Sequence, residues 1–305
     1  MTLTDMEYIV ESARYGSINK AAHALFVTQS AVSLAIQKIE EEFQIHLFQR
    51  TNRGIIATPE GNEFIRHAES ILLQTRQLRS IMESSTPAPS YRLRISSQRF
   101  PFATEAFLRY LESIPQSARY QFSLKETSMY TVINDIYDQL SDIGVIFLSD
   151  LTQDYIRRVL HQKSIEFHPL VEISPHIYLR KTHPLVCKQS ITVQDLAAYP
   201  YVSFDQDSDV SMDYAEDVRL LGFPCSERII RVHERATAIN ILANTNAFST
   251  GSGLLVSRLG DERVTAISIE DQNNHMRPGW IKRKSLYMTE EMEKYVHYLE
   301  CCAQE

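Results

Sequence analysis

The stretch Lys20–Ser33 (KAAHALFVTQSAVS) decides the fold of the first part of the chain, because it has helical spacing on both sides of a short break. Before the break, small and aliphatic side chains recur at the i, i+3, i+4 and i+7 positions of one helix face, starting from Ile18. Phe26 and Val27 interrupt this pattern, and Thr28 then offers a hydroxyl that suits the N-cap of a second helix. We therefore predict two helices joined by a turn of about three to four residues, which is the helix-turn-helix arrangement.

The second predicted helix presents a row of mostly short, uncharged polar side chains. Its apolar residues line one side of the helix, while the polar ones share another side. Such side chains can hydrogen-bond base edges in a major groove, and the free amides of a helix N-terminus suit a phosphate. The alternative is an amphipathic helical hairpin whose polar face is only solvated. The candidate DNA contacts of this helix are Thr28, Gln29, Ser30, Ser33, Leu34 and Gln37.

A short hairpin after this helix strengthens the DNA-binding interpretation. Two apolar runs flank residues 51–54 (TNRG), which have the composition of a turn. Arg50 and Arg53 lie in or beside this turn, where their guanidinium groups would contact phosphates or a minor groove. A helix-turn-helix followed by a basic wing is a more specific signal than either feature alone.

Two further helices frame this region. Thr4 and Glu7 match a capping box at the start of the first helix, and Gly16 is its candidate C-cap. Residues 58–60 (TPE) open a long helix, with the threonine as N-cap and the proline in the first turn. Its apolar stripe alternates spacings of 4 and 3, which is typical of a coiled coil and predicts dimerisation; packing within one chain is the alternative. The stripe consists of Phe64, Ala68, Ile71, Thr75, Leu78 and Met82.

Most of residues 17–61 resemble the LysR-type transcriptional regulators, in the family's order. Leu34 stands where many members carry arginine, so one DNA contact is lost, although an exposed leucine can pack on a thymine methyl group. Gln44 stands where glycine is usual, which leaves the end of the recognition helix without a glycine for the left-handed cap. The matching residues are Ala21, Ala22, Leu25, Thr28, Gln29, Ser30, Ala31, Val32, Ser33, Ile36, Ile39, Glu40, Leu47, Phe48, Arg50, Arg53, Thr58, Pro59, Glu60 and Gly61.

Strands alternate with helices after a serine- and proline-rich segment at 84–90. This βαβ alternation predicts a parallel sheet with helices on both faces. By the resemblance, the region has two α/β lobes like those of periplasmic binding proteins, and the last segment returns to the first lobe. The expected strands are 91–95, 120–124, 142–148, 176–179, 201–204, 228–232 and 279–282; the expected helices are 102–111, 132–140, 192–198, 213–221, 236–244 and one capped by Thr289.

The predicted chain is an α/β protein of three parts. An N-terminal winged helix-turn-helix is followed by a linker helix with a hinge, which serves dimerisation, and by a two-lobed effector-binding domain. The expected partners are double-stranded DNA, a small-molecule effector and further copies of the chain, in a homodimer or homotetramer. The boundaries are 1–58, 59–90 and 91–305, with lobe 1 at 91–163 plus 269–305 and lobe 2 at 164–268.

Candidate effector contacts follow from the predicted strands. In open α/β sheets, ligands bind at the carboxyl ends of strands, where helix N-termini meet. Hydroxyls, amides and one guanidinium at these positions suit a small anion or a polar organic molecule; the alternative is that they are only turns and caps. The candidates are Ser97, Gln98, Arg99, Thr127, Ser128, Ser203, Phe204, Thr237, Thr250 and Gly251, the last two in a loop over residues 250–253.

Composition excludes several classes of protein. The chain has 305 residues, of which 44% are hydrophobic and 23% charged, as is typical of a globular protein with two or more domains. No apolar run is long enough to span a bilayer and no basic n-region marks a secretory signal, so no membrane association is expected and the cytoplasm is the predicted location. The net charge of −7 alone argues against nucleic acid, so the DNA-binding hypothesis depends on where the charges lie.

Motifs for catalysis, metals or cofactors are not found. The sequence has no H-E-x-x-H, no P-loop and no dinucleotide-binding glycine motif, so no catalytic residue, metal or cofactor is predicted. An enzyme or transport-type binding protein that uses the cleft is one alternative, which Arg50 and Arg53 beside the hairpin disfavour. A redox regulator acting through Cys187 and Cys225 is another, although the four cysteines form no C-x-x-C pair.

Overall fold

The computed structural model describes the backbone of most of the chain, which divides into two compact units, Met1–Ala88 and Pro89–Glu305. In the long helix of the first unit, the side chains of residues 77 and 80–83 lie outside the description. The described residues are 1–51, 54–83, 91–188, 191–204, 228–254, 261–269 and 274–304.

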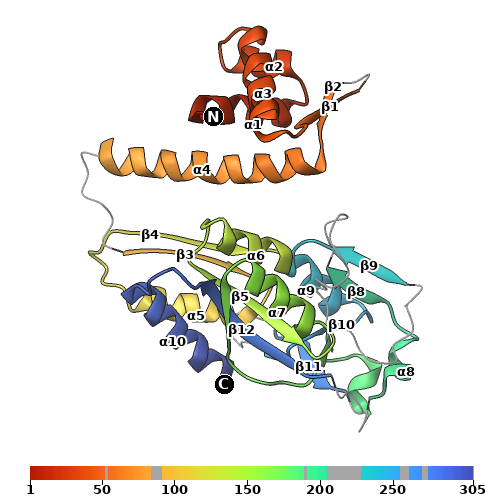
Figure 1. Ribbon diagram of the computed structural model, residues 1–305. Coiled ribbons are helices and arrows are strands. Elements are labelled where there is room, and N and C mark those ends of the chain that lie inside the picture. The colour runs from red at the N-terminus through yellow and green to blue at the C-terminus, as the bar shows by residue number, and fades with distance from the viewer. Residues whose placement is uncertain are drawn as a thin grey trace. The chain divides into compact units, whose positions relative to one another are not determined.

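The N-terminal unit is a winged helix-turn-helix with a long helix packed on it (Figure 1). The helix-turn-helix prediction is confirmed, because Phe26 and Val27 separate two helices and the Thr28 hydroxyl accepts a hydrogen bond from the amide of Ala31 at 3.3 Å. The wing is a two-stranded antiparallel hairpin that pairs Arg50 with Ile55. The elements are α1 (Leu3–Tyr15), α2 (Ile18–Ala24), α3 (Gln29–Phe43), β1 (Phe48–Thr51), β2 (Gly54–Ala57) and α4 (Pro59–Glu83).

The helix ends differ from the predictions at two places. The capping box of α1 uses Thr2 and Asp5, so the prediction of Thr4 and Glu7 is wrong by two residues. The amide of Asp5 donates to the Thr2 hydroxyl at 3.1 Å, and the amide of Thr2 donates to the Asp5 carboxylate at 2.8 Å. At the end of α3, Gln44 itself adopts the left-handed conformation, with φ of 55°, so the helix has its left-handed cap without a glycine.

Helix α4 packs along α1. Ala68 and Leu72 are buried against Met6 of α1, and Ile65 joins the core of the helix-turn-helix. The N-terminal 58 residues and α4 therefore form one compact unit, and Phe64 and Ala68 of the predicted stripe pack within the chain. Two further residues of the stripe are exposed, Ile71 at 40% and Leu78 at 56%, and the side chain of Met82 lies outside the described residues.

Lobe 1 of the second unit is built on a five-stranded sheet in the order β4-β3-β5-β12-β6. Strands β3, β4 and β5 are parallel, but β12 is antiparallel to both of its neighbours, β5 and β6. The prediction of a parallel sheet is therefore wrong for the pairs that β12 forms. The elements are β3 (Tyr91–Ser97), α5 (Pro101–Glu112), β4 (Tyr120–Glu126), α6 (Met129–Tyr137), β5 (Ile143–Ser149), α7 (Gln153–Gln162), β6 (Ile165–Pro169), β12 (Met276–Arg283) and α10 (Glu290–Gln304).

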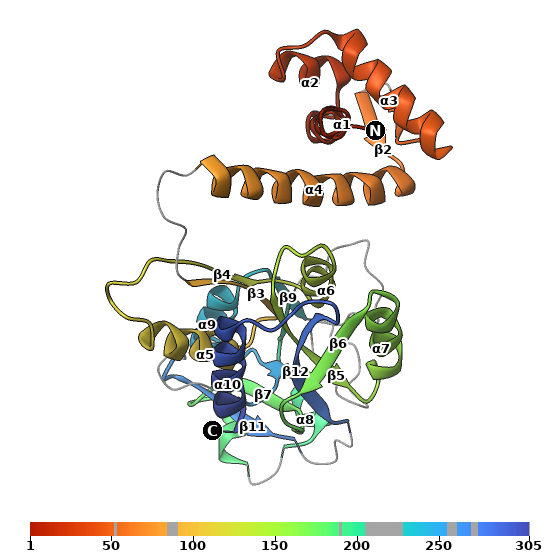
Figure 2. The ribbon, with the colours of Figure 1, turned by 60° about the vertical axis from the view of Figure 1, so that its left-hand side comes forward.

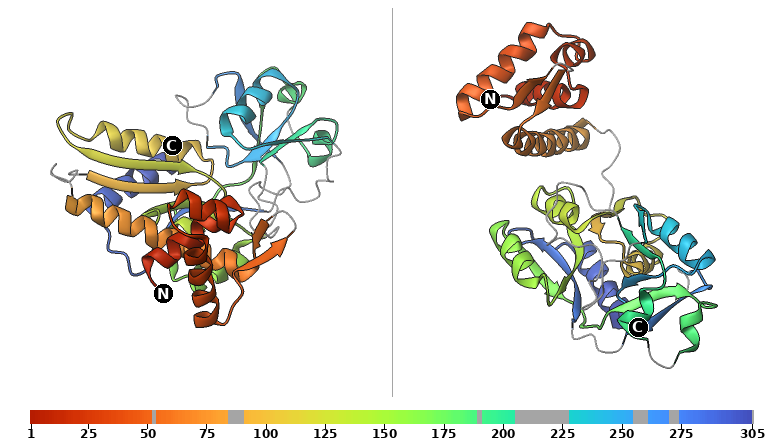
Figure 3. Two further views of the ribbon diagram at one scale, coloured as in Figure 1. Left: turned by 90° about the horizontal axis from the view of Figure 1, so that it is seen from above. Right: turned by 90° about the vertical axis from the view of Figure 1, so that its right-hand side faces the viewer.

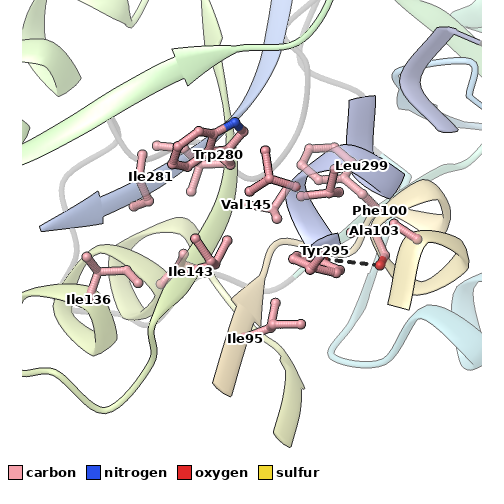
Figure 4. Packing of buried hydrophobic residues seen from close by; sticks show 14 of the residues in the cluster. Ile95, Phe100, Ala103, Ile136, Ile143, Val145, Trp280, Ile281, Tyr295 and Leu299 are labelled. Atoms are coloured by element: carbon pink, nitrogen blue, oxygen red, sulfur yellow. Dashed lines mark hydrogen bonds between the residues drawn. The ribbon is translucent and has the colours of Figure 1, made fainter. Parts of the chain in front are cut away.

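The C-terminal segment completes the core of lobe 1. Helix α10 lies beside α5, where the Tyr295 hydroxyl donates to the Ala103 carbonyl at 3.2 Å (Figures 2 and 4). Figure 4 also shows Val145 of β5 and Trp280 of β12 in the same core. The return of the last segment to lobe 1 is confirmed. However, β6 belongs to this sheet as well, so the predicted boundary at residue 164 is wrong, and the chain crosses to lobe 2 only after Pro169.

Lobe 2 is smaller and contains two short sheets (Figure 3). Strands β10, β7 and β11 form an antiparallel sheet, whereas β8 and β9 form a parallel pair. The predicted loop at 250–253 is wrong in its first half, because Ser249–Gly251 is a strand. The helix predicted at 213–221 lies outside the described residues. The elements are β7 (His176–Arg180), η1 (Pro184–Cys187), α8 (Val193–Leu196), β8 (Tyr201–Phe204), β9 (Ile229–Val232), α9 (Arg235–Asn244), β10 (Ser249–Gly251) and β11 (Val264–Ser268).

The two segments that connect the lobes pair with each other. Ile173 and Met276 form an antiparallel bridge, with N–H···O distances of 2.9 and 2.8 Å. Beside the bridge, Arg277 contacts Asp150 at 2.6 Å and Glu172 at 2.8 Å. Hydrogen bonding from Arg277 holds the pKa of Asp150 below its ordinary value. This paired hinge is the natural axis for relative movement of the two lobes.

A membrane-spanning helix is not found. Within the described residues, each helix is either too short or too polar to cross a bilayer.

Candidate functional site

Helix α3 divides its residues between a buried face and an exposed one. Val32, Ala35, Ile36 and Ile39 are buried in the core of the N-terminal unit. On the other side, the candidate contacts form one continuous surface on which only Ser33 is partly covered. Leu34 is the apolar member of this surface and is 67% exposed. The exposed surface consists of Thr28, Gln29, Ser30, Ser33, Leu34 and Gln37.

Hydrogen bonds along the helix order these side chains. The Gln29 amide donates to the Ser33 hydroxyl at 2.8 Å, and the hydroxyls of Thr28 and Ser30 lie 3.0 Å apart. Gln37 donates in the same way to Glu41 at 2.7 Å. Because these bonds hold each side chain in one rotamer, less side-chain entropy is lost when a base edge replaces the partner.

The wing carries an exposed positive charge. Lys38 of α3 forms an ion pair with Asp5 of α1 at 3.0 Å, which directs it toward the first helix. Arg50, by contrast, is exposed on β1. Arg53 lies outside the described residues. Arg50 of the hairpin is thus an exposed charge that can meet a phosphate, and so is Lys20 of α2.

A cavity of about 100 Å³ in the second unit is lined by residues of both lobes. Phe100 and Phe147 contribute from lobe 1, and Leu242 and Val264 contribute from lobe 2. Met276 lines it from the start of β12, next to the hinge. A cavity at a hinge between two lobes is where a small ligand can favour one arrangement of the lobes over another.

The ten predicted effector contacts divide into two groups of five. Gln98, Arg99, Phe204, Thr250 and Gly251 line the cavity. The other five do not line it. The hydroxyls of Ser97 and Ser203 donate to the backbone carbonyls of Gln98 and Phe204, and the amide of Thr127 donates to the carbonyl of Ser97. Ser128 is the N-cap of α6, and Thr237 is exposed in the first turn of α9.

Several lining residues were missed by the sequence analysis, including Tyr178, Arg235 and Ser249, whereas Ser252 belongs to the loop that was expected at 250–253. Tyr178 packs so closely on Gly251 that a Cβ there would lie 2.3 Å from its ring. Burial raises the pKa of Tyr178, and its hydroxyl accepts the amide of Gly253 at 2.8 Å. A basic residue in the first turn of a helix, as Arg235 is in α9, was the signal in the sequence that could have been used.

Two arginines bridge the lobes at this cavity. Arg99 of lobe 1 donates from Nε to the carbonyl of His233 at 3.0 Å, and its guanidinium lies 4.7 Å from the ring centre of Phe204. In the opposite direction, Arg235 of lobe 2 forms an ion pair with Glu126 at 2.9 Å. A charged side chain from each lobe therefore contacts the other lobe.

The redox alternative named Cys187 and Cys225, of which the structure describes only the first. Cys187 is exposed, Cys302 is buried, and Cys225 lies outside the described part of the chain. No group of three or more histidine, cysteine, aspartate or glutamate side chains there is arranged to hold a metal ion.

The fold and the two sites define a class of protein, a DNA-binding regulator with an attached ligand-binding domain. The model of the bacterial regulatory helix-turn-helix proteins of the lysR family matches residues 3–62, and the model of the LysR substrate binding domain matches residues 92–301. The chain belongs to the LysR family of transcriptional regulators, whose members bind DNA and small-molecule effectors and are not enzymes.

Individual relatives agree with this assignment over long stretches. The transcriptional regulator AlsR of Bacillus subtilis (strain 168) is 26% identical over 230 residues, which are 73% of this chain and 71% of AlsR. GltR of the same organism is 22% identical over 307 residues, 98% of this chain and 96% of GltR. The structure of full-length CbnR complexed with its target DNA shares the fold, with a TM-score of 0.62 at 16% identity over 99% of this chain and all of CbnR.

Proposed function

We propose that this regulator reads its operator with the exposed face of α3 and holds the DNA backbone with the wing. Gln29, Ser30 and Ser33 would contact base edges, and the Thr28 hydroxyl, Arg50 and Arg53 would contact phosphates. The observation that carries the proposal is the exposed row of short polar side chains on α3, beside a hairpin that bears an exposed arginine.

The proposed assembly is a homodimer or homotetramer formed through α4. Ile71 and Leu78 are exposed on α4. Apolar side chains spaced by seven residues on one helix suit a second helix of the same kind. Such a dimer presents two copies of α3, and the operator would then be two-fold symmetric. Its place of action is the cytoplasm, where the DNA of a bacterium is found.

Control is proposed to come from a small molecule in the interlobe cavity. A ligand that contacts both lobes binds one arrangement of the lobes more tightly than others, and it therefore shifts the population toward that arrangement. The hinge beside Met276 converts this shift into a movement of lobe 2. In an oligomer, such a movement would change how the DNA-binding units are spaced on the operator.

The direct test is recovery of fragmented genomic DNA by the purified full-length protein at physiological salt, followed by sequencing. We expect enrichment of a few short sites with two-fold symmetry. The double variant Gln29→Ala/Ser33→Ala should lose this enrichment, while the matched control Gln162→Ala on the exposed end of α7 should keep it. Enrichment that is equal for both variants would remove α3 from the readout, and no enrichment at any salt concentration would contradict the proposal as a whole.

A further inference from the structure

We propose that Phe26, in the turn between α2 and α3, packs its ring on a deoxyribose of the DNA backbone and so helps to position α3 in the major groove. This inference rests on the proposed docking of α3, and it adds an apolar contact that does not depend on sequence. The exposure of Phe26, its backbone conformation and its place beside the N-terminus of α3 carry the inference.

Phe26 is almost fully exposed. At 93%, its side chain is the most exposed large hydrophobic one in the described part of the chain. The neighbouring Leu25 and Val27 are partly buried, and Val27 packs on the core of the helix-turn-helix. The ring therefore adds almost nothing to the packing of the N-terminal unit, and its hydration is unfavourable.

The backbone of Phe26 is left-handed, with φ of 56°. It occupies the C′ position of a Schellman motif at the end of α2. The amide of Val27 donates to the Ala22 carbonyl at 3.0 Å, and the amide of Phe26 donates to the His23 carbonyl at 3.2 Å. Glycine is usual at C′ because any Cβ is strained there, and it would make the same two hydrogen bonds. Phenylalanine thus costs stability twice at this position, which indicates that the ring has a use outside the fold.

The N-terminus of α3 places Phe26 beside the DNA backbone. The first amides of a helix have no partner within it, so they suit a phosphate, and Thr28 is the N-cap residue here. The Cα atom of Phe26 lies two residues away along the chain, hence within about 7.6 Å of that of Thr28. Phosphates alternate with deoxyriboses in a DNA strand. A side chain beside a bound phosphate therefore meets a sugar, whose C–H groups offer an apolar surface to an aromatic ring.

The surface next to the ring favours DNA over a protein as its partner. Thr28, Gln29 and Ser30 follow directly in the chain, and all three are exposed on the face that is proposed to meet the operator. A protein that covered the ring would also cover this face and would compete with DNA. A contact with the sugar instead adds to the docking of α3.

The test measures the affinity of the full-length wild type and Phe26→Asn for operator and random duplexes at several salt concentrations. Asparagine tolerates the left-handed conformation, so this variant removes the ring and leaves the turn in place. We expect a loss of roughly 10-fold for both duplexes, because apolar contact area is lost and the sugar is the same in every sequence. The slope of log K against log salt should stay unchanged, because no phosphate contact is removed.

Further variants separate docking from folding. Phe26→Gly relieves the backbone strain, so it should unfold at the same or a higher temperature than the wild type while binding DNA as weakly as Phe26→Asn. Phe26→Tyr keeps the ring and should bind within about threefold of the wild type. The matched control Tyr287→Asn removes an aromatic side chain that is 86% exposed in the second unit, and it should leave the affinity for DNA unchanged.

Several outcomes would overturn the inference. Wild-type affinity in Phe26→Asn would do so, as would a Phe26→Tyr variant that binds as weakly as Phe26→Asn. A loss confined to the operator would show that the ring reads a base, and a lower melting temperature in Phe26→Gly would assign the ring to the fold. None of these results alters which genomic sites the wild-type protein recovers, so the proposed function would stand or fall separately.

Discussion

Leu34 gives the reading surface of α3 a group that cannot hydrogen-bond. It is 67% exposed and lies between Ser30, Ser33 and Gln37 on the helix surface. In a major groove, an exposed aliphatic side chain finds its complement in the C5-methyl group of thymine. We therefore expect Leu34→Ala to relax a preference for thymine at one position of each half-site. The measurement is the binding affinity for an operator in which each thymine in turn is replaced by deoxyuridine.

The methyl-deletion scan has an internal control. Removing the thymine methyl group that Leu34 contacts should weaken operator binding by the wild type by about 1 kcal/mol, as for a lost buried methylene. The same replacement should leave operator binding by the Leu34→Ala variant unchanged. Positions that Leu34 does not contact should affect both proteins equally. A scan with no difference between the two proteins at any thymine would remove Leu34 from the readout.

Gln29 should contribute more than Leu34 to the discrimination between operator and random DNA. Its amide is already ordered by Ser33 at 2.8 Å, and a glutamine can make two hydrogen bonds to an adenine. Gln29→Ala is expected to weaken operator binding by about 1–3 kcal/mol while affinity for random DNA stays unchanged. Competition titrations with operator and random duplexes check this. Equal losses for both duplexes would assign Gln29 to the DNA backbone instead.

Residue-scale predictions from the sequence succeeded where a side chain acts on its own neighbours. The Thr28 cap depends only on a hydroxyl and an amide three residues away, and it was predicted correctly. The start of α1 was missed because Thr2–Asp5 and Thr4–Glu7 satisfy the same capping pattern, and only the packing of the helix decides between them. The cavity residues Tyr178 and Ser249 were missed because they meet across strands about 70 residues apart.

At the scale of elements, the wing provides a prediction about salt. Arg50 is exposed on β1, and a guanidinium that meets a phosphate contributes to affinity independently of sequence. Arg50→Ala should weaken binding to operator and random DNA by similar factors and reduce the slope of log K against log salt by about 1 for each subunit. Titrations at several salt concentrations measure the slope. The matched variant Arg158→Ala, on α7, should leave it unchanged.

The exposed apolar residues of α4 provide a prediction about assembly. Leu78 is 56% exposed and Ile71 is 40% exposed. Leu78→Glu places a charge in the proposed helix pair and should shift the protein toward the monomer, as seen by sedimentation or light scattering. Glu69→Gln on the same helix serves as the control. A monomeric wild type, or an unchanged mass for Leu78→Glu, would contradict dimerisation through this stripe.

The hydrophobic periodicity of the sequence predicted the presence of helices and strands better than it predicted their packing partners. The stripe of α4 was recognised, but its residues Phe64 and Ala68 pack within the same chain, and the spacing alone does not distinguish such packing from a partner helix. Helix α7 was missed because it is rich in polar and charged residues and buries only Ile156 and Leu160. Strand β6 was missed for a related reason, since it lies at the edge of the sheet with mostly half-buried residues.

At the scale of the whole molecule, pairing between strands that are distant in the sequence determines the strand directions that local sequence patterns do not predict. Alternating strands and helices correctly predicted the parallel strands β3, β4 and β5. Strand β12 is antiparallel to β5 and enters the sheet after the chain has returned from lobe 2. The alternation of strands and helices predicts parallel neighbours within one lobe, but it does not predict the direction of a strand that returns from another lobe. The family resemblance provided the return of the chain, while the position of β6 required the structure.

The pH dependence of stability is a property of the whole folded unit, and His183 provides a prediction for it. His183 is 1% exposed, and burial lowers its pKa below the ordinary value of 6.5. Its Nδ1 accepts the amide of Leu185 at 3.1 Å, so Nε2 carries the proton of a neutral ring and donates to the Asn246 carbonyl at 3.1 Å. The folded protein thus favours the uncharged imidazole and fastens the loop before β10 to η1 with it.

The sign of the effect follows from this preference. Well above pH 6.5 the imidazole of His183 is neutral in both the folded and the unfolded state, and its full contribution to the free energy of unfolding is present. As the pH falls below 6.5, the unfolded chain binds the proton first, so the free energy of unfolding decreases until the pH passes the lowered pKa of the folded state. His183→Gln should therefore be less stable than the wild type at about pH 8, by about 1–3 kcal/mol, with a difference that shrinks toward about pH 5. Urea unfolding across this range measures it, with the exposed His161→Gln as control. A difference between wild type and His183→Gln that is constant with pH would show that His183 acts by packing alone.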